Sequence, residues 1–283
     1  MYKNYWNLTE KPFENTPDPR FFYCSSKHEE ALMRLMYVVE ERKSSSMLSG
    51  DYGSGKTLLS RVLMGKLLQE EDKYKVALIV NPAIPVLELL SEIVYQLGIE
   101  TSRQDRKIDI LRRLNENLYK TAEGNKHTVI IIDEAQAIED DSVFEELRLL
   151  LNFQLNERFL LTLILLGQPE LREKIAKLPQ LKQRLAVYYH LTCLTESEIS
   201  GYIRHRVNVA GQSESIFAED TYKLIYDYSQ GVPRQINNIC DLSLVIAMAE
   251  KATQINQRII KEVIKDFQQG QEAIGNIEDK MNG

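Results

Sequence analysis

Residues 50–57 constrain this chain more than any other segment, because Gly-Asp-Tyr-Gly-Ser-Gly-Lys-Thr fits the phosphate-loop pattern G-x-x-x-x-G-K-[S/T]. A loop that surrounds a triphosphate needs inward-pointing backbone N–H groups, and glycines allow the close approach. In such a loop Lys56 reaches the β- and γ-phosphates, and the Thr57 hydroxyl binds Mg²⁺. The residues predicted to contact the nucleotide are Gly50, Asp51, Tyr52, Gly53, Ser54, Gly55, Lys56, Thr57 and Leu58.

The sequence on either side of the loop supports this interpretation, because a phosphate loop joins a strand to a helix. A short apolar segment at 46–48 precedes it, and Leu59, Val62 and Leu63 follow with helical spacing. The alternative is a Gly/Ser turn that precedes a lysine by chance, and the flanking pattern makes it much the weaker one.

Composition indicates an ordinary globular protein. The 283 residues suffice for one large or two modest domains, and the net charge of −6 gives no overall attraction to nucleic acid or anionic lipid. Cys24, Cys193 and Cys240 are widely separated, which favours reduced thiols over a disulfide or zinc framework. Since no apolar run has membrane-spanning length and no signal-peptide pattern opens the chain, we expect a soluble cytoplasmic protein.

Strands and helices alternate along the first two thirds of the chain. Apolar runs predict strands at 75–80, 128–132, 159–166 and 187–191, and amphipathic spacing predicts helices at 85–97, 108–119 and 142–153. This alternation predicts an α/β fold, with a parallel sheet covered by helices on both faces.

Only helical periodicity follows residue 191, with predicted helices at 196–210, 220–229, 233–251 and 256–268. We therefore predict three parts. Residues 1–193 form an α/β nucleotide-binding domain with an N-terminal extension, residues 194–268 form an all-α lid domain, and residues 269–283 form a flexible polar tail.

Asp133 and Glu134 end the predicted strand at 128–132, at the edge where α/β sheets bind ligands. Asp133 is placed to hold Mg²⁺, and Glu134 is placed to polarise an attacking water. The alternative, an acidic cap on the next helix, is weakened by the phosphate loop upstream. With the extra strand at 75–80 between the two motifs, the pair favours an ATP hydrolase over a simple kinase.

Three further polar residues are candidates for the same chemistry. Gln168 follows the strand at 159–166 and could sense the γ-phosphate or orient the water; a plain turn before Pro169 is its alternative. Arg184 precedes the last strand and is a candidate arginine finger, a cation that would offset charge on the ATP bound to a neighbouring subunit. Arg234 begins a helix of the helical domain and could report γ-phosphate occupancy. A solvated surface arginine is the alternative for both.

Two short basic clusters are interpreted as solvated helix faces, with a nucleic-acid groove kept as the alternative. Their members are Arg103, Arg106, Lys107, Arg112 and Arg113 in the first, and Arg204, His205 and Arg206 in the second.

Taken in order, the motifs closely resemble the general secretion pathway protein A family, a branch of the AAA+ ATPases. The resemblance runs from about residue 5 to residue 249. It is carried by K-P-F-x-x-x-P-D-P at 11–19, F-Y at 22–23, H-x-x-A-L at 28–32, the loop at 50–57, I-I-I-D-E-A-Q at 130–136, E-E-L-R-L-L-L-N at 145–152, G-Q-P-E-L at 167–171, L-K-Q-R-L at 181–185 and G-V-P-R-Q-I-N at 231–237.

The resemblance implies an AAA+ fold that uses ATP and Mg²⁺, with Lys56 in the Walker A motif, Asp133 and Glu134 in the Walker B motif, and oligomers with ATP between subunits. It implies that Gln168, where other branches have Asn or Thr, and Arg234 sense the γ-phosphate. It also implies that Arg184 is an arginine finger, which acts on the ATP of a neighbouring subunit. A protein partner in secretion or export is expected.

Longer relatives continue into a transmembrane helix and a peptidoglycan-binding module, whereas this sequence ends at Gly283. We therefore expect no membrane span of its own and an inner-membrane association only through a partner. The chain is also similar to transposition regulators of the TnsC and MuB type, so a DNA-assembled regulator is the alternative function.

Overall fold

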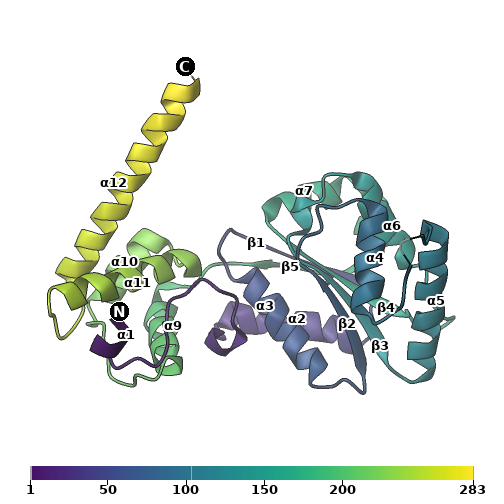
Figure 1. The fold of residues 1–283 in the computed structure, drawn as a ribbon, viewed down its shortest axis with the longest axis horizontal. Coiled ribbons are helices and arrows are strands. Elements are labelled where there is room, and N and C mark those ends of the chain that lie inside the picture. The colour runs from purple at the N-terminus through teal and green to yellow at the C-terminus, as the bar shows by residue number, and fades with distance from the viewer. Residues whose placement is uncertain (1, 103, 283) are drawn as a thin grey trace. The chain divides into compact units, whose positions relative to one another are not determined.

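The chain forms two units in the computed structural model, which describes residues 2–102 and 104–282, with side chains up to residue 270. One unit comprises Ser26–Thr192, and the other combines Met1–Ser25 with Cys193–Gly283 (Figure 1). Arg103 of the first basic cluster lies outside the described residues.

A five-stranded parallel sheet forms the centre of the Ser26–Thr192 unit. Its strands are β1 (Ser45–Gly50), β2 (Tyr74–Ile79), β3 (His127–Ile132), β4 (Leu161–Gly167) and β5 (Leu185–Leu191). They lie in the order β2-β3-β4-β1-β5, and every neighbouring pair is parallel. The predicted α/β class is confirmed.

Helices flank both sides of this sheet (Figure 1). They are α2 (Ser26–Glu40), α3 (Lys56–Leu68), α4 (Val86–Gln96), α5 (Lys107–Glu123), α6 (Asp141–Leu150), α7 (Pro169–Ala176) and the short α8 (Pro179–Lys182), with a 3-10 turn, η2, at Ala135–Ala137. Helix α2 was not expected from the sequence.

Burial on both faces explains why the central strands are continuously apolar. Side chains alternate along a strand, and one set packs in a single cluster with α4 to α7: Ala77, Ile79, Ile130, Ile132, Leu163 and Leu165. The residues between them on β3 and β4 are also buried. A parallel sheet covered on both sides requires this pattern.

The second unit is helical and includes the N-terminal segment. Its helices are α9 (Glu196–Val209), α10 (Thr221–Ser229), α11 (Pro233–Ala249) and α12 (Gln257–Asn282), with α1 (Tyr2–Tyr5) and the 3-10 turn η1 (Pro19–Phe21) near the N-terminus. Helix α12 continues through most of the predicted tail at 269–283, whose side chains from residue 271 lie outside the described part of the chain.

The N-terminal extension differs from its predicted place, because residues 1–25 pack in the helical unit rather than with the sheet. Trp6, Phe13 and Phe21 are buried in the same cluster as the residues of α9 to α12. The Trp6 indole N–H donates to the Leu244 carbonyl at 3.1 Å. These large apolar side chains need a buried surface, and the helices provide it.

Arg206, on α9, holds this segment from inside the unit. Its guanidinium donates to the carbonyl oxygens of Pro12 and Glu14, and it lies 4.9 Å from the centre of the Phe21 ring. Asn237 on α11 donates to the side chain of Asn15 at 2.9 Å. Arg206, a member of the second predicted basic cluster, therefore fixes the N-terminal segment to the helical unit.

His127 begins β3 as a buried neutral side chain. The Thr162 hydroxyl donates to the Lys43 carbonyl at 2.6 Å, so the His127 Nε2–H donates to Thr162 Oγ1 at 2.8 Å. Burial, with Arg42 and Arg158 nearby, lowers the pKa of His127 to about 3.

This depressed pKa predicts a loss of stability in mild acid. The unfolded histidine binds a proton near pH 6.5, whereas the folded one does not until about pH 3. The free energy of unfolding should therefore fall by about 1.4 kcal/mol per pH unit well below pH 6.5. His127→Gln keeps a donor for Thr162 and should take up one proton fewer on unfolding at pH 5, measured by calorimetry in buffers of different ionisation enthalpy. Equal proton uptake in both proteins would contradict the assignment.

Candidate nucleotide site

The predicted phosphate loop joins β1 to α3 at the carboxyl end of β1. Gly55 has φ of 99°, a conformation that strains any other residue. At Gly50 the constraint is space, because a Cβ there would lie 2.7 Å from the Leu191 carbonyl oxygen of β5. Glycine is thus required at these two positions for different reasons. Tyr52 is exposed, and Leu58 lies in the first turn of α3.

Lys56 is 5% exposed, and its ammonium lies inside the loop. It donates to the carbonyl oxygens of Gly50 at 2.8 Å and Asp51 at 2.9 Å. The Ser54 hydroxyl is also buried, and it has no hydrogen-bond partner among the described residues. A buried cation and an unpaired buried hydroxyl in a glycine loop fit a loop that is completed by a phosphate ligand.

His28, on α2, braces the same loop from outside. Its Nε2 lies 3.0 Å from the Ser54 carbonyl oxygen, and a Cβ at Gly55 would lie 3.0 Å from that nitrogen. We assigned no role to His28 from the sequence. Its place at the start of the H-x-x-A-L motif was a signal, but the contact with the loop joins two separate elements, which a local pattern does not show.

Asp133 and Thr57 come together from β3 and α3. Asp133 is 1% exposed, and burial raises the pKa of its carboxyl group, against hydrogen bonds from Thr57 and from the Glu134 N–H that lower it. The Ser60 hydroxyl lies 3.4 Å from Asp133 Oδ2. A desolvated carboxylate beside a hydroxyl favours a bound cation.

This donor set suits Mg²⁺. Among the described residues there is no group of three or more His, Cys, Asp or Glu side chains that could enclose a metal. Mg²⁺ typically takes one or two protein oxygens and completes its shell with phosphate oxygens and waters. Asp133 and Thr57, next to the phosphate loop, fit that requirement.

Glu134 and Gln168 are brought together by a third residue, Gln136. The Gln136 amide donates to Glu134 Oε2 at 2.5 Å and accepts from the Gln168 backbone N–H at 3.0 Å. The Gln168 side-chain amide lies 3.4 Å from the same Glu134 oxygen. We assigned no role to Gln136 from the sequence, although it stands two positions after Glu134 in the same motif.

Arg184 lies at the opposite end of the sheet from the loop. The pairing of β1 with β5 sets Ser45 beside Leu185 and Gly50 beside Leu191, so Arg184 is at the amino end. Its guanidinium donates to Asn152 Oδ1 at 3.1 Å. The structure therefore does not bring Arg184 to its own chain's loop, and its role toward a neighbouring subunit stays a prediction.

Arg234 belongs to the helical unit, in the first turn of α11 after Pro233. Its sensor role also stays a prediction.

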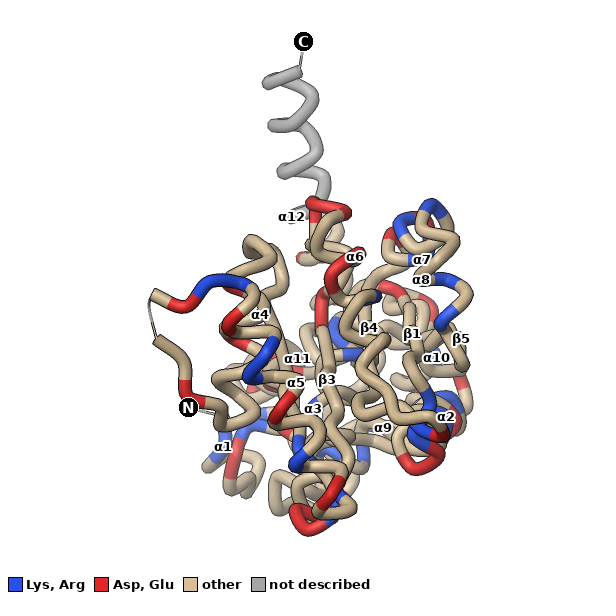
Figure 2. Tube along the Cα trace, turned by 90° about the vertical axis from the view of Figure 1, so that its right-hand side faces the viewer, with Lys and Arg blue, Asp and Glu red and all other residues tan. Residues whose placement is uncertain are grey.

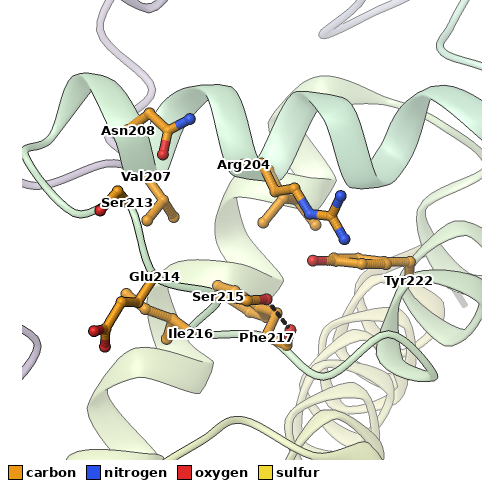
Figure 3. Close-up of a pocket in the computed structure, with 10 residues that line it drawn as sticks. Arg204, Val207, Asn208, Ser213, Glu214, Ser215, Ile216, Phe217 and Tyr222 are labelled. Carbon is orange, nitrogen blue, oxygen red and sulfur yellow. Dashed lines mark hydrogen bonds between the residues drawn. The ribbon is translucent and has the colours of Figure 1, made fainter.

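The described members of the basic clusters are largely engaged within the chain. Carboxylates pair with Arg106, Lys107, Arg113 and Arg204. Arg204 lies over the Tyr222 ring, beside a hollow of about 310 Å³ between α9 and residues 213–217 (Figure 3). Basic and acidic residues are interspersed along the chain (Figure 2). These pairs indicate neutralised, solvated helix faces, whereas the interpretation is wrong for Arg206, which is buried against the N-terminal segment.

Comparison with known proteins supports the motif analysis. Residues 39–175, which include the loop, Asp133, Glu134 and Gln168, match the AAA domain family. The chain is 34% identical over 257 residues to general secretion pathway protein A of Aeromonas hydrophila, covering 90% of this chain and 46% of that protein. The resemblance inferred from the motifs is confirmed.

Two further similarities cover part or most of the chain. An uncharacterized HTH-type transcriptional regulator of Methanocaldococcus jannaschii is 29% identical over 145 residues, or 50% of this chain and 35% of that protein. The chain thus spans less than half the length of both curated relatives. The solved ORC2 protein of Aeropyrum pernix, in ADPNP–ADP complexes, has a TM-score of 0.70 at 20% identity, covering 90% of this chain and 71% of that one. No helix in the described residues is long and apolar enough to cross a membrane.

The backbone at Gly55 predicts a sharp contrast between this glycine, which directly precedes α3, and Gly65, which lies inside α3. Gly55→Ala should strain the loop by about 1–2 kcal/mol and press on His28, weakening nucleotide binding about tenfold or more. The control is Gly65→Ala, because an added Cβ there has nothing within 4 Å in the helix interior. It should leave binding unchanged and stabilise the protein by about 0.5–1 kcal/mol. Titration with a fluorescent ATP analogue and thermal unfolding measure both. Unweakened binding by Gly55→Ala would contradict the loop assignment.

Proposed function

We propose that this chain, which has the P-loop AAA+ fold and is related to general secretion pathway protein A, binds ATP with Mg²⁺ and hydrolyses it. The observation that carries the proposal is the meeting of the Lys56 loop with the buried Asp133–Thr57 pair and with Glu134 at one sheet edge. ATP binding alone would not require a second carboxylate, Glu134, beside the Mg²⁺-binding Asp133. Glu134 therefore favours hydrolysis over a passive nucleotide switch.

Each residue has a distinct task in this proposal. Lys56 and the loop N–H groups hold the phosphates, and Asp133 and Thr57 would hold Mg²⁺, which neutralises charge on the phosphate oxygens. Glu134 accepts a hydrogen bond from the attacking water and orients it. The Gln168 amide, within reach of the same carboxylate, senses the γ-phosphate.

We further propose that the working form is a homo-oligomer. Arg184 lies at the sheet end opposite its own loop, which suits a cation that acts on the nucleotide of a neighbouring subunit. Arg234 on α11 would report nucleotide occupancy to the helical unit.

The proposed partner is a protein of a secretion or export system, encountered at the cytoplasmic face of the inner membrane. The support is the 34% identity to general secretion pathway protein A over 90% of this chain. ATP binding and hydrolysis would drive the remodelling of that partner.

Two substitutions separate binding from hydrolysis. Lys56→Ala should abolish ATP binding, because it removes the cation held inside the loop. Glu134→Gln should keep the wild-type dissociation constant for ATP and lower turnover by about a hundredfold or more, since an amide cannot accept the water's proton. Equilibrium binding and a phosphate-release assay measure the two effects. Wild-type turnover in Glu134→Gln would remove its catalytic role.

DNA as an assembly partner is less well supported, because Arg106, Lys107, Arg113 and Arg204 pair with carboxylates and Arg206 contacts backbone carbonyls. We expect no ATP-dependent gel shift with duplex DNA even at low salt, where phosphate contacts are strongest. A shift that weakens steeply with added salt would reverse this conclusion.

A further inference from the structure

We infer that Gln136 is a positioning residue, which sets the orientation of Glu134 and links it to Gln168; this inference rests on the proposed hydrolysis. The side chain of Gln136 is the bridge between the two. Its Nε2 donates to Glu134 Oε2 at 2.5 Å, and its Oε1 accepts from the Gln168 N–H at 3.0 Å.

The bridge depends on the chemistry of a primary amide, which donates and accepts at the same time. A carboxylate at position 136 could still accept from the Gln168 N–H but could not donate to Glu134. An apolar side chain of similar length could do neither. The donation to Glu134 can therefore be removed alone, and the two hydrogen bonds can be removed together.

The local backbone is shaped to admit this side chain. A Cβ at Gly167 would lie 2.7 Å from Gln136 Oε1, so glycine at the end of β4 leaves the room that the amide occupies. Glu134 has φ of 52°, in the left-handed region, and the 3-10 turn at Ala135–Ala137 returns Gln136 toward it. The left-handed backbone of Glu134 and the absence of a Cβ at Gly167 both allow the hydrogen bond between Gln136 and Glu134.

The hydrogen bond from Gln136 fixes one of the two carboxylate oxygens of Glu134, and this affects how Glu134 meets the attacking water. Gln136 fixes Oε2 of Glu134, with the Gln168 amide 3.4 Å from the same atom. Rotation of the carboxylate is thus restricted, and its other oxygen is aimed in one direction for the water. Because the N–H of Gln168, which directly precedes α7, is bonded to Gln136, a shift of that residue on contact with a γ-phosphate would pass through Gln136 to Glu134.

The test compares Gln136→Met, which removes both hydrogen bonds, with Gln136→Glu, which keeps the acceptor for the Gln168 N–H but replaces the donation to Glu134 with a like charge beside it. Both should lower kcat about tenfold to a hundredfold, while the dissociation constant for ATP and the melting temperature stay at wild-type values. The control is Gln180→Met, the same change at an exposed position on α8. It should leave every parameter unchanged.

A double substitution tests whether the Gln136 and Gln168 side-chain amides act together on the same Glu134 oxygen. If they do, the loss of kcat in Gln136→Met combined with Gln168→Met should be smaller than the product of the two single losses. Unchanged kcat in both Gln136 variants, or a loss of ATP binding and thermal stability together with kcat, would overturn the positioning role. If the wild-type chain itself released no phosphate, the proposed function would fail first, which distinguishes the two failures.

Discussion

The parallel register of β1, β4 and β3 decides where the candidate site forms. Ser49 pairs with Gly167, and Ile132 pairs with Leu165, so the residues that follow these strands emerge at one edge of the sheet. The phosphate loop and the segments after β3 and β4 therefore meet only because the strands run in the same direction. A slip of one residue in either pairing would turn the side chains to opposite faces.

Features that cost folding stability are concentrated at this edge of the sheet. Asp133 is a buried carboxyl group whose pKa is raised by burial, and Glu134 has a left-handed backbone. Each of these costs stability, and such costs persist only where the surrounding structure enforces them. Strands β3 and β4, buried on both faces, provide that rigid support. Hydrolysis would use the same features, since a desolvated carboxylate favours a cation and a fixed turn holds Glu134 in place.

Much of the site could be predicted because its parts are local patterns. The glycine loop carries Lys56 and Thr57, and an apolar strand that ends in two acids carries Asp133 and Glu134. The contacts that complete the site could not be predicted in this way. His28 reaches the loop from α2, and the role of Gln136 depends on the space left by Gly167 on another strand. The N-terminal segment was placed with the wrong unit, because apolar residues indicate burial without indicating the surface that buries them.

The sequence by itself determined the α/β class, the phosphate loop and the acidic strand end, since periodicity and glycine spacing are properties of neighbouring residues. Only the tertiary structure decided which residues act on one another. It set Gln136 between Glu134 and Gln168, placed Arg184 at the end of the sheet opposite the loop, and used Arg206 to hold the N-terminal segment. The physical reason is that hydrogen bonds and burial depend on distances between segments, which strand order and register set and a linear pattern does not contain.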